Sequence, residues 1–340
     1  MNKTTACILW SVDRTEPLIN QLTQDLTNGC LEALPDSGSA VKNIDEKKYR
    51  IIRKSVGKYT AIAVSSDINR IKSKKVIESE IDTFLAAAPT IDSAIERAEG
   101  RTRRLLHNLK SLTAKTSQEV FYIAQQDVLM VNPREAVPYV AQEIRENSEA
   151  AARAFLEILK HQSAQKAEYT AFDRLSGKLE VGAIERHEIH RVLMNVFYLF
   201  FGEFIAKKVR VDVGQTYLQG IFDYDSIHVC IYYLVENAAK YARSKGDFSV
   251  SVRDDGNGFI DVRFVMESLI ILADEKERIF EEGYSGVNAV DEKLSGAGLG
   301  LYLARAMAKL NGGQLNVIPG HVTSGGKYAR NVFVLTLPSR

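Results

Sequence analysis

Three alternating glycines constrain this chain more than any other feature of its sequence. Gly296, Gly298 and Gly300 stand directly before an apolar helical pattern, SGAGLGLYLARAMAKLNGG (295–313), which ends at Asn-Gly-Gly (311–313). Backbone without side chains can pass close to an anion, and the helix that follows directs its first amides at the same point. A GxGxG pattern alone is more often a turn, so its meaning depends on the neighbouring motifs.

Two further motifs precede the glycines. The helical stretch HVCIYYLVENAAKYA (228–242) carries Glu236, Asn237 and Lys240 near its end, and RIFEEGYSG (278–286) follows it. In this order the three motifs resemble the N-box, F-box and glycine box of the GHKL ATPases, the superfamily of histidine kinases and gyrase-like enzymes. The resemblance covers about residues 186 to 337 and implies a C-terminal α/β sandwich of the GHKL (Bergerat) type.

The resemblance also implies roles for these side chains. The family's asparagine oxygen binds Mg²⁺, which fits Asn237 because this ion takes oxygen ligands and keeps several waters. Glu236 matches the neighbouring acid or base, and Lys240 matches the residue that approaches phosphate, with Tyr241 beside it. The three glycines and Leu299 would line the phosphate end. The implied cofactors are ATP and Mg²⁺.

The family's adenine-reading motif, DxGxG, has two candidate positions. DDGNG (254–258) fits its letters, but it begins only 17 residues after Asn237. Relatives place this aspartate roughly 30 residues after the asparagine and about 14 before the phenylalanine of the F-box. Met266 is 29 residues after Asn237 and 14 before Phe280, which is the family's spacing.

Strand patterns favour the second position. FSVSVR (248–253) and FIDVRF (259–264) alternate like the arms of a hairpin, with DDGNG as its turn. We therefore predict a surface turn at DDGNG and place Met266 and Ser268 at the adenine position. Methionine cannot accept the adenine N6 hydrogens at useful strength. We therefore expect a weak affinity for the nucleotide or a weak preference for its base, unless Ser268 and a water molecule replace the missing contact to adenine.

A helical region precedes this ATPase-like part. The pattern is helical from about residue 91 to 166 and breaks at Asn132-Pro133. Asn132 can cap a new helix, Pro133 can be its first residue and Glu135 can complete a capping box. Two long helices joined by a short loop form an antiparallel hairpin. Its apolar seam is expected to pair with a second copy in a dimeric four-helix bundle.

His107 is predicted to lie on the polar face of the first helix. Leu105, Leu109 and Leu112 form the apolar seam, and His107 lies about 200° around the helix from Leu105, so we expect it to face solvent. The stretch RTRRLLHNLKSLTAK (101–115) resembles the H-box of histidine kinases. This implies that His107 takes the γ-phosphoryl group of ATP and passes it to the aspartate of a response regulator receiver domain. The alternative is a solvated histidine on a basic helical face.

Departures from the family keep a rival hypothesis open. Asn108 stands where relatives place an acid after the histidine, and an amide can orient the ring but cannot act as a base. Tyr233 replaces a second asparagine, and Met266 replaces the adenine aspartate. The rival is a catalytically degenerate GHKL protein that acts as a nucleotide-sensing or partner-binding switch. The intact Asn237 and glycine box favour the kinase. A serine kinase of the anti-sigma type is less favoured, because such proteins lack the helical hairpin.

The fold class we predict is α+β and multidomain. Residues 1–88 read as a small α/β input or dimerisation domain, with a strand hairpin in YRIIRKSVGKYTAIAVSS (49–66). Residues 89–168 form the dimerising helical hairpin, and residues 169–340 form the ATPase-type domain, whose first helix is expected at 186–206.

Composition excludes several other classes. Lys plus Arg (44) and Asp plus Glu (43) nearly cancel, so nothing indicates nucleic acid as a partner. The most apolar run, VLMNVFYLFFGEFIA (192–206), is shorter than the ~20 residues of a membrane span, so we expect a buried helix, no membrane segment and a cytoplasmic protein. Three distant cysteines suggest reduced thiols. His187 and His190 lack a third ligand nearby and are interpreted as packing or surface residues.

Overall fold

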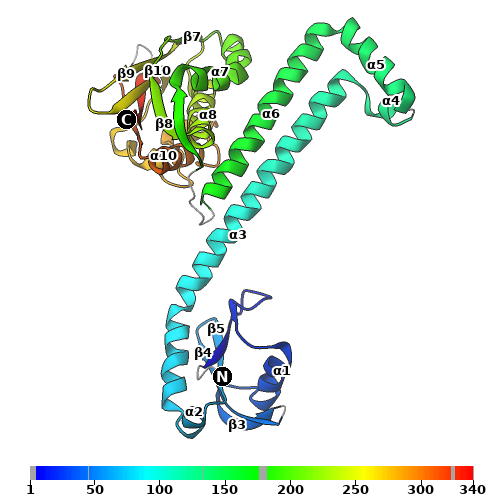
Figure 1. Ribbon diagram of the computed structural model, residues 1–340, viewed down its shortest axis with the longest axis vertical. Coiled ribbons are helices and arrows are strands. Elements are labelled where there is room, and N and C mark those ends of the chain that lie inside the picture. Colours follow the sequence, from blue (N-terminus) through cyan, green and yellow to red (C-terminus); the bar gives the residue numbers. More distant parts are fainter. Residues whose placement is uncertain (1–4, 45, 132, 176–181, 323–325, 340) are drawn as a thin grey trace. The chain divides into compact units, whose positions relative to one another are not determined.

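The computed structural model describes residues 5–44, 46–131, 133–175, 182–322 and 326–339. The chain divides into two compact units, Met1–Arg104 and Leu105–Arg340. The long helix α3 (Lys75–Ile123) contributes its first turns to one unit and its last turns to the other (Figure 1).

The first unit is an antiparallel sheet with a helix on each face. Its strand order is β2-β1-β5-β4-β3. Helix α1 (Gln24–Ala33) packs on one face through Cys30, whereas α3 packs on the other through Ile77 and Ile81, which share one side of that helix. The strand hairpin predicted in 49–66 is present. The strands are β1 (Ala6–Ser11), β2 (Ile19–Asn20), β3 (Gly38–Ile44), β4 (Lys47–Val56) and β5 (Tyr59–Ser65), and a short helix, α2 (Ile68–Lys72), follows them.

Asp92 ties α3 to the sheet within this unit. One carboxylate oxygen accepts from Arg14 Nε at 2.7 Å, and the other accepts from Tyr59 Oη at 3.0 Å and lies 3.1 Å from Lys58 Nζ. The hydrogen bonds from Arg14, Lys58 and Tyr59 hold the pKa of Asp92 at about 2, below its ordinary value. The carboxylate therefore stays ionised at all but strongly acidic pH.

Helix α3 begins at Lys75, well before the residue near 91 where the sequence pattern was expected to turn helical, and it runs through Pro89. Proline inside a helix removes one backbone hydrogen bond, so Pro89 is a local signal against a continuous helix. Leu85 and Ala88 are buried beside Pro89. Packing of these turns against the sheet stabilises the helix across the missing bond.

The second unit starts with a helical region. Helix α6 (Ser148–Leu175) runs back beside α3 (Figure 1), and Gln165 Nε2 donates to Thr113 Oγ1 at 3.3 Å between them. The connection is longer than the predicted short loop, because it contains α4 (Gln126–Val131) and α5 (Pro133–Glu146). Helix α5 begins at Pro133, as predicted; its proposed cap, Asn132, lies outside the described residues.

The rest of the second unit is an α/β sandwich. Its main sheet has the order β11-β12-β10-β9-β7, and three helices pack against it. The DDGNG turn joins β9 to β10, so the predicted hairpin is confirmed. The main elements are α7 (Ile189–Ala206), β7 (Arg210–Val213), β8 (Gln219–Asp223), α8 (Tyr224–Tyr241), β9 (Asp247–Asp254), β10 (Phe259–Leu269), α10 (Gly300–Leu310), β11 (Gln314–Ile318) and β12 (Tyr328–Pro338).

Helix α7 provides much of the aromatic core. Phe197, Phe200 and Phe204 lie on one side of the helix and are almost completely buried, and Phe248 of β9 stacks on Phe197 with a centroid distance of 5.4 Å. Among the described residues, α7 is the one helix that by length and composition could cross a membrane. Its packing in this core agrees with the buried helix that the sequence predicted.

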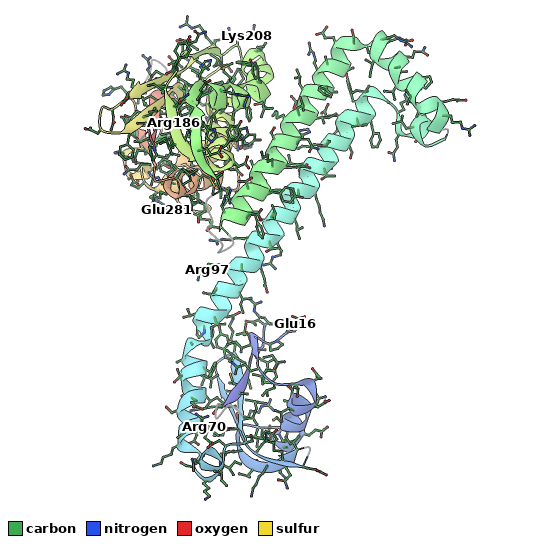
Figure 2. All side chains as sticks on the ribbon, in the orientation of Figure 1. Glu16, Arg70, Arg97, Arg186, Lys208 and Glu281 are labelled. Carbon is green, nitrogen blue, oxygen red and sulfur yellow. The ribbon has the colours of Figure 1, made fainter. Side chains whose placement is uncertain are left out.

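The helix expected at 186–206 starts later than predicted. Residues Ile184–Glu188 form a strand, β6, which pairs antiparallel with β8, and α7 begins at Ile189. The side chain of Arg186 is exposed on this strand (Figure 2). Pairing with β8 supplies the backbone partners that a first helical turn would otherwise provide, which explains the difference.

Candidate functional site

A cavity of about 290 Å³ opens in the sandwich, where α8, the end of β10 and the segment before α10 meet. Every residue that the sequence assigned to the ATP site lies in its lining; His107 does not. The assigned residues are Glu236, Asn237, Lys240, Tyr241, Met266, Ser268, Gly296, Gly298, Leu299 and Gly300.

One side of α8 forms the polar wall of the cavity. Tyr233, Glu236, Asn237, Lys240 and Tyr241 recur at helical spacing and line the cavity together, whereas the opposite side of α8 is buried in the core. Burial raises the pKa of Glu236 to about 7, and the positive charge of Lys240 opposes part of this shift. The Glu236 carboxyl group can therefore exchange a proton near neutral pH.

The glycine segment needs glycine for two different reasons. Gly298 has a φ of 68°, and a Cβ there would lie 2.6 Å from the backbone nitrogen of Tyr284, so a side chain would force the backbone to shift. A Cβ on Gly296 would lie 3.0 Å from Lys240 Nζ, and one on Gly300 would lie 3.5 Å from Asn237 Nδ2. The missing side chains thus leave room beside the two polar groups best suited to phosphate and to a cation.

The end of the cavity at β10, where the sequence predicts the adenine position and which is called the base end below, has methionine in place of a carboxylate at position 266. Met266, 2% exposed, and Ser268, 5% exposed, point into the domain from β10 and line the cavity. Asp254 ends β9 at the exposed hairpin turn, where its side chain accepts from Gly256 N at 2.8 Å. The structure therefore brings Met266 and Ser268 to the cavity and leaves Asp254 outside its lining.

Glu275 is a cavity residue that the sequence interpretation missed. Its carboxylate is 1% exposed and accepts hydrogen bonds from Leu272 N (3.0 Å), Tyr284 Oη (2.8 Å) and Val287 N (2.7 Å). These bonds, above all the one from Val287, offset burial and lower the pKa of Glu275. The ionised carboxylate fixes the segment after β10 against the F-box.

Two more residues of the helical region line the cavity. Asn108 of α3 donates from Nδ2 to Glu168 Oε1 of α6 at 3.2 Å, and Tyr233 Oη of α8 donates to the same oxygen at 3.5 Å. Two of the three positions where the sequence departs from the family pattern, Asn108 and Tyr233, thus share one carboxylate. His107 is exposed on α3, as its helical position predicted.

Two other histidines, His187 and His190, contact groups within the same domain. Among the described residues, no group of three or more His, Cys, Asp and Glu side chains is placed to hold an ion. His187 lies 5.1 Å from the ring of Phe222, and His190 Nδ1 lies 3.3 Å from the Gly214 carbonyl oxygen. His187 therefore packs against aromatic rings and His190 makes a local hydrogen bond, which agrees with their interpretation as packing or surface residues.

This sandwich, with its polar helix wall and its glycine segment around one cavity, defines a nucleotide-binding domain of the GHKL type. Residues 222–340 match the family described as histidine kinase-, DNA gyrase B- and HSP90-like ATPase. Residues 222–340 thus form a domain of this ATPase family, and the curated relatives found for the chain are histidine kinases.

Histidine protein kinase SaeS from two strains of Staphylococcus aureus, USA300 and bovine RF122, is 34% identical to this chain over 86 residues. The match covers 25% of this chain and 24% of SaeS, so the chain spans about a quarter of the length of these relatives.

Solved histidine kinases are also similar in structure. The match to the mycobacterial sensor histidine kinase MprB covers 46% of this chain and 99% of the MprB chain, with 19% identity and a TM-score of 0.40. The match to the histidine kinase ThkA, solved in complex with the response regulator protein TrrA, covers 99% of this chain and 96% of the matched chain, with 13% identity and a TM-score of 0.42.

Proposed function

We propose that this protein is a histidine kinase that binds Mg-ATP in the cavity, phosphorylates His107 and passes the phosphoryl group to an aspartate of a response regulator. The observation that carries the proposal is the phosphate end of the cavity. There Asn237 and Lys240 stand beside glycines whose missing side chains leave room for the triphosphate.

The residues at this end fit a magnesium ion. Asn237 offers an amide oxygen and Glu236 a carboxylate, and Mg²⁺ takes oxygen ligands from few side chains because it keeps several waters. Asn237 would hold the ion, which would neutralise charge on the phosphates. Lys240 would contact phosphate directly, because its ammonium group is a compact positive charge.

In the proposed reaction a ring nitrogen of His107 attacks the γ-phosphorus of ATP. A nitrogen–phosphorus bond forms, the bond from the phosphorus to the bridging oxygen of ADP breaks, and the ring proton passes to solvent or to a carboxylate. Exposure of His107 suits a nucleophile that has to meet a separate nucleotide domain. Glu236, with a pKa of about 7, can accept a proton near neutral pH.

The helical region supports the rest of the proposal. Leu106, Phe155 and Leu156 are exposed apolar side chains on α3 and α6. Such faces are covered when two hairpins associate, so we propose a homodimer through a four-helix bundle. We further propose that the protein acts in the cytoplasm, with a receiver domain as its partner.

Incubation of the full chain with γ-labelled ATP and Mg²⁺ tests the proposal. We expect acid-labile, base-stable label that His107→Ala removes and that His161→Ala, on the other helix of the hairpin, leaves in place. Labelling that persists in His107→Ala would contradict the assigned acceptor.

Met266 favours one alternative, a nucleotide-responsive or partner-binding switch without kinase activity, because the base end lacks a strong acceptor for adenine. Binding of Mg-ATP without any label on the wild-type protein would favour the switch over the kinase.

A further inference from the structure

The base end of the cavity contains one hydroxyl group whose hydrogen-bonding role is fixed by a buried amide. Asn331 of β12 is 0% exposed. Its Nδ2 donates to Ser268 Oγ at 2.9 Å and to the Leu269 carbonyl oxygen at 2.9 Å, and its Oδ1 accepts from Gly320 N at 3.1 Å. Both amide hydrogens and the amide oxygen are engaged, so the amide has only one orientation that satisfies this network.

The Ser268 hydroxyl therefore keeps its hydrogen for a group in the cavity, while Asn331 occupies one of its two acceptor lone pairs. The hydroxyl oxygen accepts from Asn331, and within the described part of the chain no acceptor receives its own hydrogen. A serine hydroxyl has one hydrogen to give, so this hydrogen remains for a ligand.

The acceptors at this end are neutral, or are a carboxylate that is already engaged. The Leu269 carbonyl accepts from Asn331, and the Ile270 carbonyl accepts from Asn288 Nδ2 at 2.8 Å. The Met266 thioether accepts hydrogen bonds only weakly. The Glu275 carboxylate already accepts three hydrogen bonds from its own segment. The base end thus offers a free donor and neutral acceptors, but no unengaged carboxylate to accept from a base.

We propose that the Ser268 hydroxyl reads the acceptor on the purine edge, N1 of adenine or O6 of guanine, and that the site binds ATP and GTP with similar affinity. The inference rests on the proposed function of the cavity as a nucleoside triphosphate site. A carboxylate at position 266 would accept from adenine N6 and repel guanine O6. Met266 does neither, so the group that would discriminate between the bases is missing.

Calorimetric titration of the full chain with Mg-ATP, Mg-GTP and Mg-tripolyphosphate tests this inference. We expect the dissociation constants of the two nucleotides to agree within about tenfold. A preference for ATP of more than about 100-fold would overturn the inference while leaving the proposed function intact. Absence of binding by all three ligands would overturn both.

Substitutions at Ser268 separate binding of the base from binding of the phosphates. Ser268→Ala should lower the affinity for both nucleotides about fivefold, because one hydrogen bond to the base is lost. The affinity for tripolyphosphate should stay unchanged. Ser268→Thr keeps the hydroxyl and should restore binding. The matched control is Ser251→Ala on β9, whose side chain is not part of the cavity lining. Equal affinities for wild type and Ser268→Ala would overturn the assignment.

A restored acceptor should restore selectivity. Met266→Asp should raise the ratio of ATP to GTP affinity at least about tenfold. Because a buried carboxylate can unfold the domain, Met266→Gln provides a neutral acceptor of similar length and should shift the ratio in the same direction. An unchanged ratio in a folded Met266→Gln protein would count against the inference.

Discussion

Asn108 Nδ2 lies 3.2 Å from Glu168 Oε1, so an amide on α3 and a carboxylate on α6 form a hydrogen bond in the helical hairpin, next to the candidate phospho-acceptor. The bond requires a donor at position 108. An acid at this position, as in related kinases, would place two carboxylates against each other.

Asn108→Asp should therefore lower the free energy of unfolding by about 1 kcal/mol at pH 8, because a hydrogen bond is replaced by repulsion. Adding Glu168→Gln should recover most of the loss, since an amide can again donate to a carboxylate. Denaturant unfolding of the two single variants and the double variant gives the coupling energy. Additive effects would show that the two side chains do not interact in solution.

Glu236 should make the stability of the ATPase-type domain depend on pH. Its pKa is raised to about 7 in the folded protein, so the folded state holds the proton more tightly than the unfolded state. Stability therefore falls as pH rises from the unfolded value, near 4.5, to about 7, and stays constant above it. Glu236→Gln should remove this slope and stabilise the domain at pH 8 by up to about 3 kcal/mol. Unfolding curves of both proteins at pH 5, 7 and 9 measure this dependence of stability on pH. If Glu236→Gln shows the same slope as the wild type, groups other than Glu236 cause it.

Local patterns predicted the parts of the site that lie on single elements. The polar side of α8 follows from helical spacing, and Met266 was placed by counting residues along a hairpin whose strands alternate. Glu168 and Asn331 were missed because their partners lie 60 and 63 residues away in the sequence. No short pattern contains such a pair, and only the packed fold brings its members together.

The fold was predictable to a similar degree. Glycines, caps and strand alternation located the sandwich and the start of α5, because these signals act within a few residues. The start of α3 was placed too late, since tertiary packing of its first turns overrides the break that Pro89 suggests. Strand β6 was read as helix because its pairing with β8 is not visible locally.

The first unit should depend on the charge of Asp92. Its pKa of about 2 lies below the ordinary value, so its contribution to stability is complete above that value and is lost as pH falls toward 2. Asp92→Asn should lower the melting temperature of this unit on the order of 5 °C at pH 7, because Arg14 and Lys58 lose their buried ionised partner and keep only the more exposed Glu99 and Asp13.

The matched control for Asp92 is Asp82→Asn, which removes an exposed ion pair with Lys54 and should change the melting temperature little. Calorimetry of both variants measures the difference. Equal effects would show that the Asp92 cluster contributes no more than a surface pair.

Gly298 and Gly256 allow backbone strain to be separated from close packing. Their φ values are 68° and 78°, so alanine at either position pays a similar penalty of about 1 kcal/mol for the left-handed backbone. A Cβ at Gly256 would meet nothing within 4 Å, whereas one at Gly298 would overlap the backbone of Gly283 and Tyr284. Gly298→Ala must therefore also push the glycine segment away from the F-box, where Gly283 N now donates to Gly298 O at 3.0 Å.

We expect Gly256→Ala to keep wild-type affinity for Mg-ATP and Gly298→Ala to weaken it at least about tenfold, because the displaced segment lines the cavity beside Asn237 and Lys240. Titration of both variants with Mg-ATP, after their melting temperatures show that they are folded, measures the effect. If Gly298→Ala binds as tightly as Gly256→Ala, the nucleotide does not need the glycine segment in this position, and the phosphates must bind elsewhere.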